Sequence, residues 1–341
     1  MKDLEKSVAE EIADVSMGRP HVVLLGAGAS RAAFPQGERS GKHLPTMADF
    51  FEIASITDAV AGAHIPYSGR NFEEFYSELA KDPAKATIRE ALERAVFDYF
   101  SALALPDEST LFDTLVLSLR PKDVIATFNW DPFLIQAVRR NGHVGGAPRL
   151  LFLHGNVLAG YCQTDEVHGV RGARCSRCGQ SFAPGRLLYP IAEKDYETDP
   201  AIHSAWRAVK WAFENAFMVT FFGYGAPQSD RGAVDLLHEA WGGWQQRNME
   251  QIEIIDIKEE HELLETWRPF VHTHHYDVHT EFYDSWIANH PRRTGEAYKS
   301  QYLDVRFIES NPVLRTSNLR ELWSWFEALV AAEAGAQRSQ R

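Results

Sequence analysis

A short apolar run that leads into a glycine-rich turn constrains this chain more than any other feature of its sequence. Residues 21–25 read His-Val-Val-Leu-Leu, and Gly-Ala-Gly-Ala-Ser follows at 26–30. A β-branched apolar run of this length predicts a buried strand, and glycines directly after it predict a tight turn into the next element. Comparable runs recur at 123–127, 149–153, 216–222 and 252–257.

Helix-like stretches separate these candidate strands, and they lie at 132–140, 201–213 and 233–244. Strands that alternate with helices form parallel sheets with helices on both faces. The sequence therefore predicts an α/β fold built on a doubly wound, Rossmann-like parallel sheet.

Three segments fall outside this alternation. Residues 47–120 have helical periodicity, which predicts an inserted helical module. Residues 156–188 are rich in glycine, arginine and cysteine, which predicts a small Cys-containing insertion. Residues 261–341 are expected to form a C-terminal extension packed on the core, with an edge strand at 302–308 and a helix at 319–334.

Composition and charge exclude several classes of function. The formal net charge of −12 repels a phosphate backbone, and no run of Lys and Arg offsets it, so we expect no direct binding to nucleic acid. No apolar stretch is long enough to span a bilayer, and the first residues lack the pattern of a secretory signal. We therefore expect a cytoplasmic protein that does not bind membranes. Three cysteines are too few for a disulfide framework.

The first candidate binding element is the glycine turn, formed by Gly26, Ala27, Gly28 and Ser30. In an open parallel sheet, ligands bind where the carboxyl ends of the strands meet. Glycines at such an end let a pyrophosphate approach the backbone, and the start of the following helix supplies N–H donors. An ordinary turn between a strand and a helix explains the same residues equally well.

Polar side chains follow the next two candidate strands. Asn129 and Asp131 come shortly after Thr127, and this pair suits recognition of ribose hydroxyls and a positioned water. Both side chains also suit the cap of the helix predicted from residue 132. His154 leaves the following strand, where an imidazole can act as a general base near neutral pH. A structural, hydrogen-bonded histidine is the alternative.

The last two candidate strands also end in polar residues. Residues 222–230 place Gly223, Ser229 and Asp230 where contacts to phosphate or ribose are expected, although a turn with a helix cap has the same composition. Asp256 follows the fifth run, where a carboxylate can bind the ribose of adenosine. An aspartate at the end of a strand is also common without a ligand.

Together these motifs resemble the sirtuin superfamily, and more closely its divergent branch in prokaryotic antiviral defence systems. The resemblance rests on Gly-Ala-Gly-Ala-Ser, Thr-Phe-Asn-Trp-Asp, Leu-His-Gly and Phe-Gly-Tyr-Gly-Ala-Pro-Gln-Ser-Asp in this order. Leu-Pro-Thr at 44–46 and Asn-Phe-Glu-Glu-Phe at 71–75 belong to the same pattern. The resemblance covers about residues 22–257.

The resemblance implies an NAD-binding domain at 21–260, preceded by an N-terminal helix within residues 1–20. It implies that the glycine turn contacts the diphosphate and ribose of NAD, and that Asn129 and Asp131 belong to the nicotinamide-ribose pocket. His154 is then the catalytic base. Ser229 and Asp230 are expected to contact the adenosine side. The remaining binding candidates are Thr127, Gly223 and Asp256.

Two departures from the deacylating sirtuins bear on the reaction. Those enzymes have a glutamine where Phe128 stands, and a four-cysteine zinc module that three cysteines cannot supply. The antiviral branch implies instead an NAD hydrolase, which cleaves the nicotinamide–ribose bond of NAD and releases nicotinamide and ADP-ribose. The alternatives are a non-catalytic sensor subunit that binds NAD or ADP-ribose, a lysine deacylase, and a scaffold in a larger complex. Because a toxic hydrolase must be kept inactive, we expect a homo-oligomer or a partner protein to control it.

Cysteines stand in the sequence position of the zinc module. Cys175 and Cys178 have the spacing of a metal knuckle, and Cys162 with His168 would complete a Cys3His tetrahedral site for structural zinc. Free thiols in a variable insertion are the alternative. A redox dithiol is disfavoured, because no strand-to-helix pattern surrounds the pair.

Overall fold

The centre of the molecule is a six-stranded sheet in which every strand pair is parallel. The computed structural model describes residues 4–191, 194–243, 245–247, 249–271 and 275–339. The strands are β2 (His21–Leu25), β3 (Val124–Thr127), β4 (Arg149–Phe152), β8 (Met218–Phe222), β9 (Gln251–Ile255) and β10 (Tyr276–His279). Their order is β10-β9-β8-β2-β3-β4, so the sheet is wound in both directions from the boundary between β2 and β8. The predicted doubly wound parallel sheet is confirmed, and β10 adds a strand that the sequence analysis missed.

The central strands end at one level. Leu25 pairs with both Thr127 and Phe222, Thr127 pairs with Phe152, and Phe222 pairs with Ile255. The loops that follow these strands therefore leave the sheet side by side. The boundary between β2 and β8 is a topological switch point, which is where open α/β sheets bind ligands.

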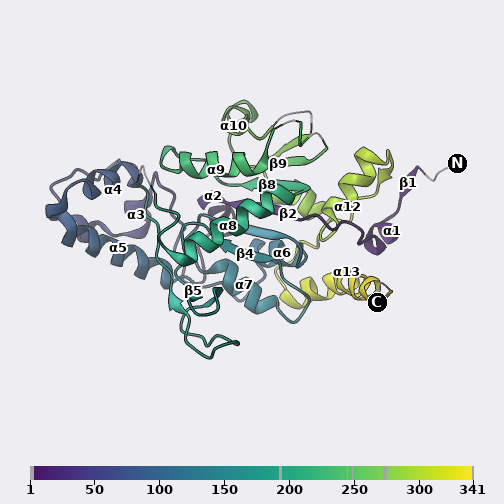
Figure 1. Ribbon diagram of the computed structural model, residues 1–341, viewed down its shortest axis with the longest axis horizontal. Coiled ribbons are helices and arrows are strands. Elements are labelled where there is room, and N and C mark those ends of the chain that lie inside the picture. Colours follow the sequence, from purple (N-terminus) through teal and green to yellow (C-terminus); the bar gives the residue numbers. More distant parts are fainter. Residues whose placement is uncertain (1–3, 192–193, 244, 248, 272–274, 340–341) are drawn as a thin grey trace.

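Helices cover both faces of the sheet (Figure 1). One face carries α8 (Pro200–Asn215), α9 (Arg231–Trp241) and α10 (Glu260–Trp267). The other face carries α2 (Ala27–Ala33), α6 (Leu111–Leu117), α7 (Phe133–Asn141) and α11 (Trp286–Asn289). Alternate strand residues pack on the two layers, Leu24 and Val219 on the first, Val23 and Ile125 on the second. Within the described ranges, none of the helices combines the length and the apolar character that crossing a bilayer requires.

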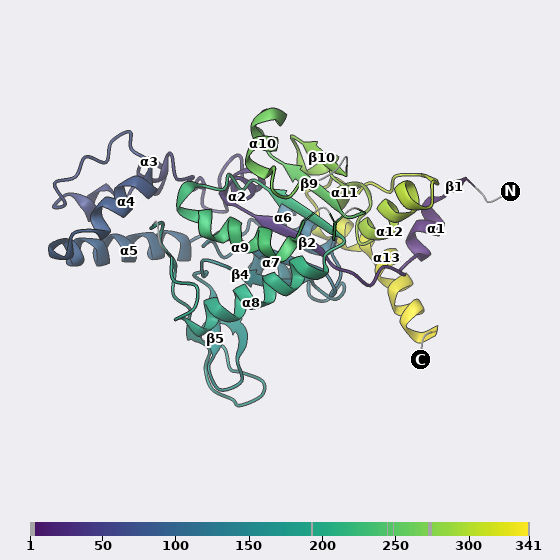
Figure 2. The same cartoon turned by 45° about the horizontal axis from the view of Figure 1, so that its top comes forward.

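Both predicted insertions are present, but the helical module is shorter than the predicted 47–120, because α6 packs on the sheet. The helical module lies at the opposite end of the molecule from the two termini (Figure 1). It consists of α3 (Phe50–Ala54), η1 (Thr57–Val60), α4 (Phe72–Ala80), η2 (Pro83–Lys85) and α5 (Ala86–Ser101). The Cys-containing insertion projects below the sheet in Figure 2. It is an antiparallel sheet of β5 (Ala159–Cys162), β6 (Val167–Val170) and β7 (Ala183–Pro184), in the order β6-β5-β7.

The C-terminal extension returns to the amino-terminal part of the chain. Its elements after α11 are α12 (Thr294–Tyr298), η5 (Lys299–Leu303), β11 (Phe307–Ile308) and α13 (Leu319–Ser339). β11 pairs in parallel with β1 (Glu5–Lys6), which precedes α1 (Val8–Ala13). The edge strand predicted at 302–308 is wrong in its first part, because the helical turn of η5 ends at Leu303 and β11 pairs outside the main sheet.

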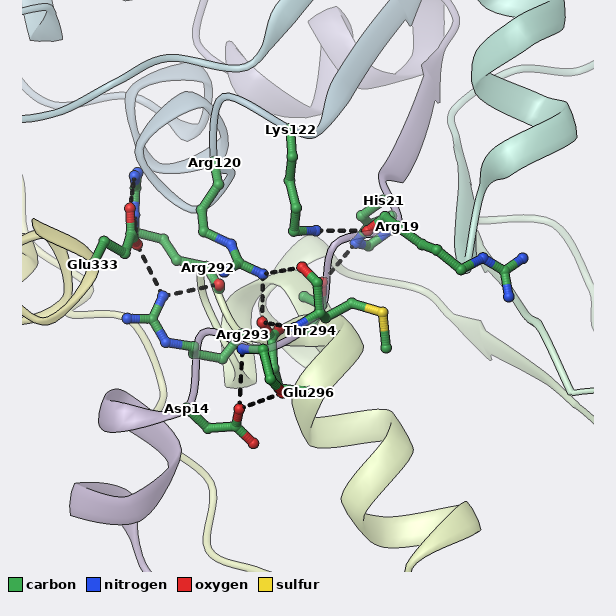
Figure 3. Close-up of polar contacts among 12 residues, drawn as sticks. Asp14, Arg19, His21, Arg120, Lys122, Arg292, Arg293, Thr294, Glu296 and Glu333 are labelled. Atoms are coloured by element: carbon green, nitrogen blue, oxygen red, sulfur yellow. Dashed lines mark hydrogen bonds and ion pairs between the residues drawn. The ribbon is translucent and has the colours of Figure 1, made fainter. Parts of the chain in front are cut away.

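A buried network of charges joins this extension to the amino ends of the strands, as Figure 3 shows. Arg120 donates to Glu296 at 2.5 Å, and Arg293 donates to Glu333 at 2.8 Å. His21, the first residue of β2, shares a hydrogen bond with Thr294 at 2.9 Å. Buried charges are tolerated only when they are paired in this way. The network therefore fixes the extension at the end of the sheet opposite the glycine turn.

Candidate active site

The glycine turn and the loop after β3 are joined by side-chain hydrogen bonds. Ser30 Oγ donates to Asp131 Oδ2 at 2.6 Å. Asn129 Nδ2 donates to the carbonyl of Gly26 at 2.8 Å and to Ser30 Oγ at 2.9 Å. Thr127 Oγ1 accepts the backbone N–H of Asn129 at 3.0 Å, which orients the loop. The structure thus brings these sequence-predicted residues into one cluster.

Asp131 is a buried carboxylate that accepts two hydrogen bonds. It accepts the bond from Ser30, and its Oδ1 accepts the backbone N–H of Phe133 at 3.3 Å, so the capping alternative describes part of its role. Burial raises the pKa of Asp131 to about 6, while the hydrogen bonds from Ser30 and Phe133 oppose that rise. The side chain is therefore mostly ionised at neutral pH and titrates just below it.

The glycines of the turn are required by the neighbouring loop. The N–H of Gly28 donates to the carbonyl of Gly223 at 2.9 Å. A Cβ at Gly28 would lie 2.8 Å from the Cα of Gly223, and one at Gly26 would lie 2.5 Å from the Cα of Tyr224. A diphosphate at this turn must therefore use other amides at the start of α2, or displace Gly223.

His154 follows β4, and its imidazole is buried at the carboxyl ends of the strands. Its Nε2 makes no hydrogen bond within the described residues and lies 3.7 Å from Asp230 Oδ1. The next residue, Gly155, has a φ of +78°, and a Cβ there would lie 2.1 Å from the carbonyl oxygen of Arg186. Glycine after the histidine therefore allows the backbone at Arg186 and Leu187 to pack against the site.

The carboxylate of Asp230, which lies beside the histidine, binds two further side chains. Its carboxylate accepts Lys194 Nζ at 2.5 Å and the hydroxyl of Tyr224 at 2.9 Å. Lys194 Nζ also donates to the carbonyl of Ser229 at 2.8 Å, and the N–H of Ser229 donates to Glu73 of α4 at 2.8 Å. The loop after β8 is therefore held both by Lys194 and by the helical module.

Sequence reasoning missed the roles of Lys194, Tyr224 and Glu73. A single lysine between two motifs gives no signal. Tyr224 and Glu73 stand inside motifs that were recognised, yet nothing in a motif says which member reaches which loop. Their contacts depend on how separate segments pack.

The environment of His154 keeps the imidazole neutral. Its pKa is lowered to about 4, chiefly by burial; the Asp230 carboxylate raises the pKa, and the positive charge of Lys194 lowers it by a smaller amount. A neutral imidazole at physiological pH is the form that accepts a proton.

Aromatic packing connects the His154 group to the glycine turn. The ring of Phe128 lies edge-on to His154 with centroids 4.6 Å apart, and it stacks on Tyr224 with centroids 4.3 Å apart. The backbone of Tyr224 in turn lies against Gly26. Loop tips after β2, β3, β4 and β8 thus meet in one place. Asp256 stands apart after β9, where its Oδ1 accepts the N–H of Lys258 at 3.1 Å.

A cavity of about 310 Å³ adjoins Lys194. It is lined by residues of α4 and α5 and by residues 185–189, 191, 194 and 195. Tyr76 and Tyr189 stack beside it with ring centroids 4.9 Å apart, and Glu93 and Arg186 contribute charge to its lining. The site therefore borders a cavity that is partly lined by aromatic side chains, on the side of α4 and α5.

The three cysteines form a second cluster, in the insertion. Cys162 Sγ lies 3.4 Å from Cys178 Sγ, and Cys175 Sγ lies 3.1 Å from Asp165 Oδ2. One ligand atom from each of these four residues lies within 4.8 Å of the others. His168 is not part of this group; it lies on β6, opposite Tyr161. The structure therefore assembles three of the four predicted ligands and supplies Asp165 as the fourth donor.

Comparisons with known proteins give a distant structural likeness. No family model matches the sequence, and no curated protein matches it. Among solved structures, a Sir2 homologue in complex with NAD is 14% identical, covers 87% of this chain and 91% of its own, and has a TM-score of 0.38. A mutant Sir2 homologue in complex with ADP-ribose is 15% identical, covers 87% of this chain and 94% of its own, and has a TM-score of 0.39. Likeness at this level assigns no family, so membership of the sirtuin superfamily stays a prediction from the motifs.

Proposed function

We propose that this protein is an NAD glycohydrolase, which splits NAD into nicotinamide and ADP-ribose. The observation that carries the proposal is the state of His154. Its imidazole is neutral, its Nε2 makes no hydrogen bond within the described residues, and it packs against Phe128, which stacks on Tyr224 of the loop after β8. Such a group is suited to take a proton from a water molecule.

The leaving group of this reaction needs no acid catalysis. When the C1′–N bond of NAD breaks, its electron pair neutralises the pyridinium, so nicotinamide leaves without needing a proton. Water forms the new bond to C1′ of the ribose, and its proton passes to His154. Positive charge develops on the ribose during this step, and the nearby carboxylate of Asp131 would offset it when ionised. Asn129 would orient a ribose hydroxyl through its Oδ1, since its Nδ2 is used by Gly26 and Ser30.

Chromatography of NAD after incubation with the purified protein tests the proposal. We expect wild type to release nicotinamide, and His154→Ala and Asn129→Ala each to lower the rate by about 100-fold or more, as expected for loss of a general base or a positioning group. His203→Ala is the matched control, because His203 is an exposed histidine on α8. Wild type that never releases nicotinamide, alone or with candidate triggers, would contradict the proposal.

The closed state of the site also favours a second candidate, a sensor subunit that binds NAD or ADP-ribose without turnover. The N–H of Gly28 is committed to Gly223 and His154 is buried, so a ligand must first move the loop after β8. Calorimetry with NAD and with ADP-ribose separates the two functions, because a sensor gives saturable binding without nicotinamide release. The same closed state supports control by a second copy or a partner protein.

The resemblance to the prokaryotic antiviral branch supports a role in defence, in which the hydrolase depletes NAD during infection. Bacteria that carry the wild-type gene or the His154→Ala variant can be challenged with a panel of phages. Protection by wild type together with loss of cellular NAD is expected. Protection that survives in the His154→Ala strain would argue against this role.

We also propose that Cys162, Asp165, Cys175 and Cys178 hold a structural zinc ion. Thiolates and one carboxylate are ligands that zinc accepts, and two sulfurs on a tetrahedral zinc lie about 3.8 Å apart, close to the arrangement of these thiols. Metal analysis should find about one equivalent of zinc. Asp165→Ala should lower that content, whereas His168→Ala should not, and the reverse result would restore the predicted Cys3His set.

A further inference from the structure

Lys194 competes with His154 for one carboxylate oxygen. Lys194 Nζ lies 2.5 Å from Asp230 Oδ1, and His154 Nε2 lies 3.7 Å from the same atom. The other oxygen of Asp230 accepts the hydroxyl of Tyr224. The lysine side chain is 2% exposed and is also fixed by the carbonyl of Ser229, so its ammonium does not swing into solvent.

We propose that Lys194 is a positioning residue of this site, which occupies the Asp230 oxygen facing the imidazole and so leaves His154 free to accept a proton. This inference rests on the proposed function, because the hydrolysis requires a group that accepts a proton. The pairing of Lys194, Asp230 and His154 exists independently of any substrate.

Among the described residues, no charged group besides Lys194 and Asp230 acts on the imidazole. Phe128 from the loop after β3 and Trp206 from α8 are uncharged. Tyr196 lies parallel to the imidazole with centroids 6.3 Å apart, and burial raises its pKa, so its hydroxyl stays neutral. Glu73 of α4 is bound to the N–H of Ser229. Burial has the largest influence on the protonation of His154, and Asp230 and Lys194 are the two charges that modify it.

The opposing effects of these two charges predict the direction in which the titration of His154 shifts when Lys194 is removed. With Lys194 present, the negative charge of Asp230 is largely neutralised and stabilises an imidazolium weakly. Without the ammonium, the same carboxylate lies close enough to hold a protonated imidazole. Removal of Lys194 should therefore raise the pH at which His154 titrates, by about one unit or more.

Nuclear magnetic resonance of the full chain with ¹³C-labelled imidazoles measures this directly. The chain has 14 histidines, and the His154→Gln variant identifies the signal of His154. We expect Lys194→Met to raise the His154 midpoint by about one pH unit or more. Lys194→Arg should keep the wild-type midpoint, because it keeps the charge. An unchanged midpoint in Lys194→Met overturns the proposal.

A double variant tests whether the released carboxylate is the cause. In Lys194→Met combined with Asp230→Asn, the rise should disappear, because no charge remains to hold the imidazolium. A rise that persists overturns the proposal. Thermal unfolding checks that each variant is folded, and if Lys194→Met fails this check, Lys194→Gln, whose amide can still donate to Ser229, decides in its place.

The titration needs no substrate, so its outcome is distinct from that of the proposed function. If wild type hydrolyses NAD, the acidic limb of its pH–rate profile should move upward in Lys194→Met by the same amount as the His154 midpoint. An acidic limb that stays in place while the midpoint moves would show that His154 is not the base, and would contradict the role proposed for His154 in the reaction while leaving the pairing intact.

Discussion

Ser30, on α2, donates a hydrogen bond to Asp131, which lies 101 positions later in the chain. This bond joins two loops that belong to neighbouring parallel strands. It also opposes the rise that burial causes in the pKa of Asp131. The charge of the carboxylate and the closeness of the two loops therefore depend on the same hydroxyl.

We expect Ser30→Ala to destabilise the protein by about 1 to 3 kcal/mol, because a buried carboxylate loses a hydrogen bond and stays unsatisfied on that side. The pKa of Asp131 should rise further, since the change removes an interaction that lowers it. Urea unfolding at pH 8 measures the loss of stability. Ser101→Ala, at the exposed end of α5, is the control and should match wild type. Equal stability of the two variants would mean that the bond contributes nothing.

Gly28→Ala tests the close approach of the two glycine loops. A Cβ at this position would lie 2.8 Å from the Cα of Gly223, so the loop after β8 must move or the fold must carry strain. We expect a loss of about 1 to 3 kcal/mol in the free energy of unfolding, the usual cost of overpacking. Gly232→Ala is the matched control, because no atom lies within 4 Å of its added Cβ. That change, in the first turn of α9, should be neutral or slightly stabilising.

The part of the fold predicted from sequence is the part set by local pattern. β-branched apolar runs reveal β2, β3, β4, β8 and β9, and parallel strands necessarily bring their following loops to one edge. The sixth strand was missed because β10, Tyr276–His279, is a half-buried edge strand whose sequence, Tyr-Asp-Val-His, is not an apolar run.

The site was predictable only as a set of motifs. Asn129 and His154 could be singled out because each follows a strand directly. Lys194 could not, because its contact with Asp230 spans 36 residues and depends on the packing of a segment without regular structure. Asp165 was missed for a related reason: a lone aspartate near Cys162 has no signature until the loop folds back and brings its carboxylate to the thiols.

His154 should make the stability of the protein depend on pH. Burial lowers its pKa from 6.5 to about 4, so the unfolded chain binds the proton more readily than the folded one. The stability from the neutral imidazole is therefore fully present above about pH 6.5 and is lost as the pH falls toward 4, by up to about 1.4 kcal/mol per pH unit. His154→Gln should flatten this fall in urea unfolding measured across that window. His203→Gln should keep the wild-type slope, and identical slopes for all three proteins would rule out the buried, neutral state.

Glu333 on α13 should be essential for holding the C-terminal extension on the sheet. It accepts Arg292 Nε at 2.6 Å and Arg293 Nη1 at 2.8 Å, and both guanidinium groups are almost fully buried. Glu333→Gln leaves two buried cations without their carboxylate, and removing one partner of a buried ion pair costs about 3 kcal/mol or more. Glu327→Gln, on an exposed position of the same helix, should be close to neutral. Urea unfolding of both variants checks the difference. If Glu333→Gln unfolds at the wild-type urea concentration, the network of Figure 3 does not fix the extension, and the amino ends of the strands must be stabilised by apolar packing alone.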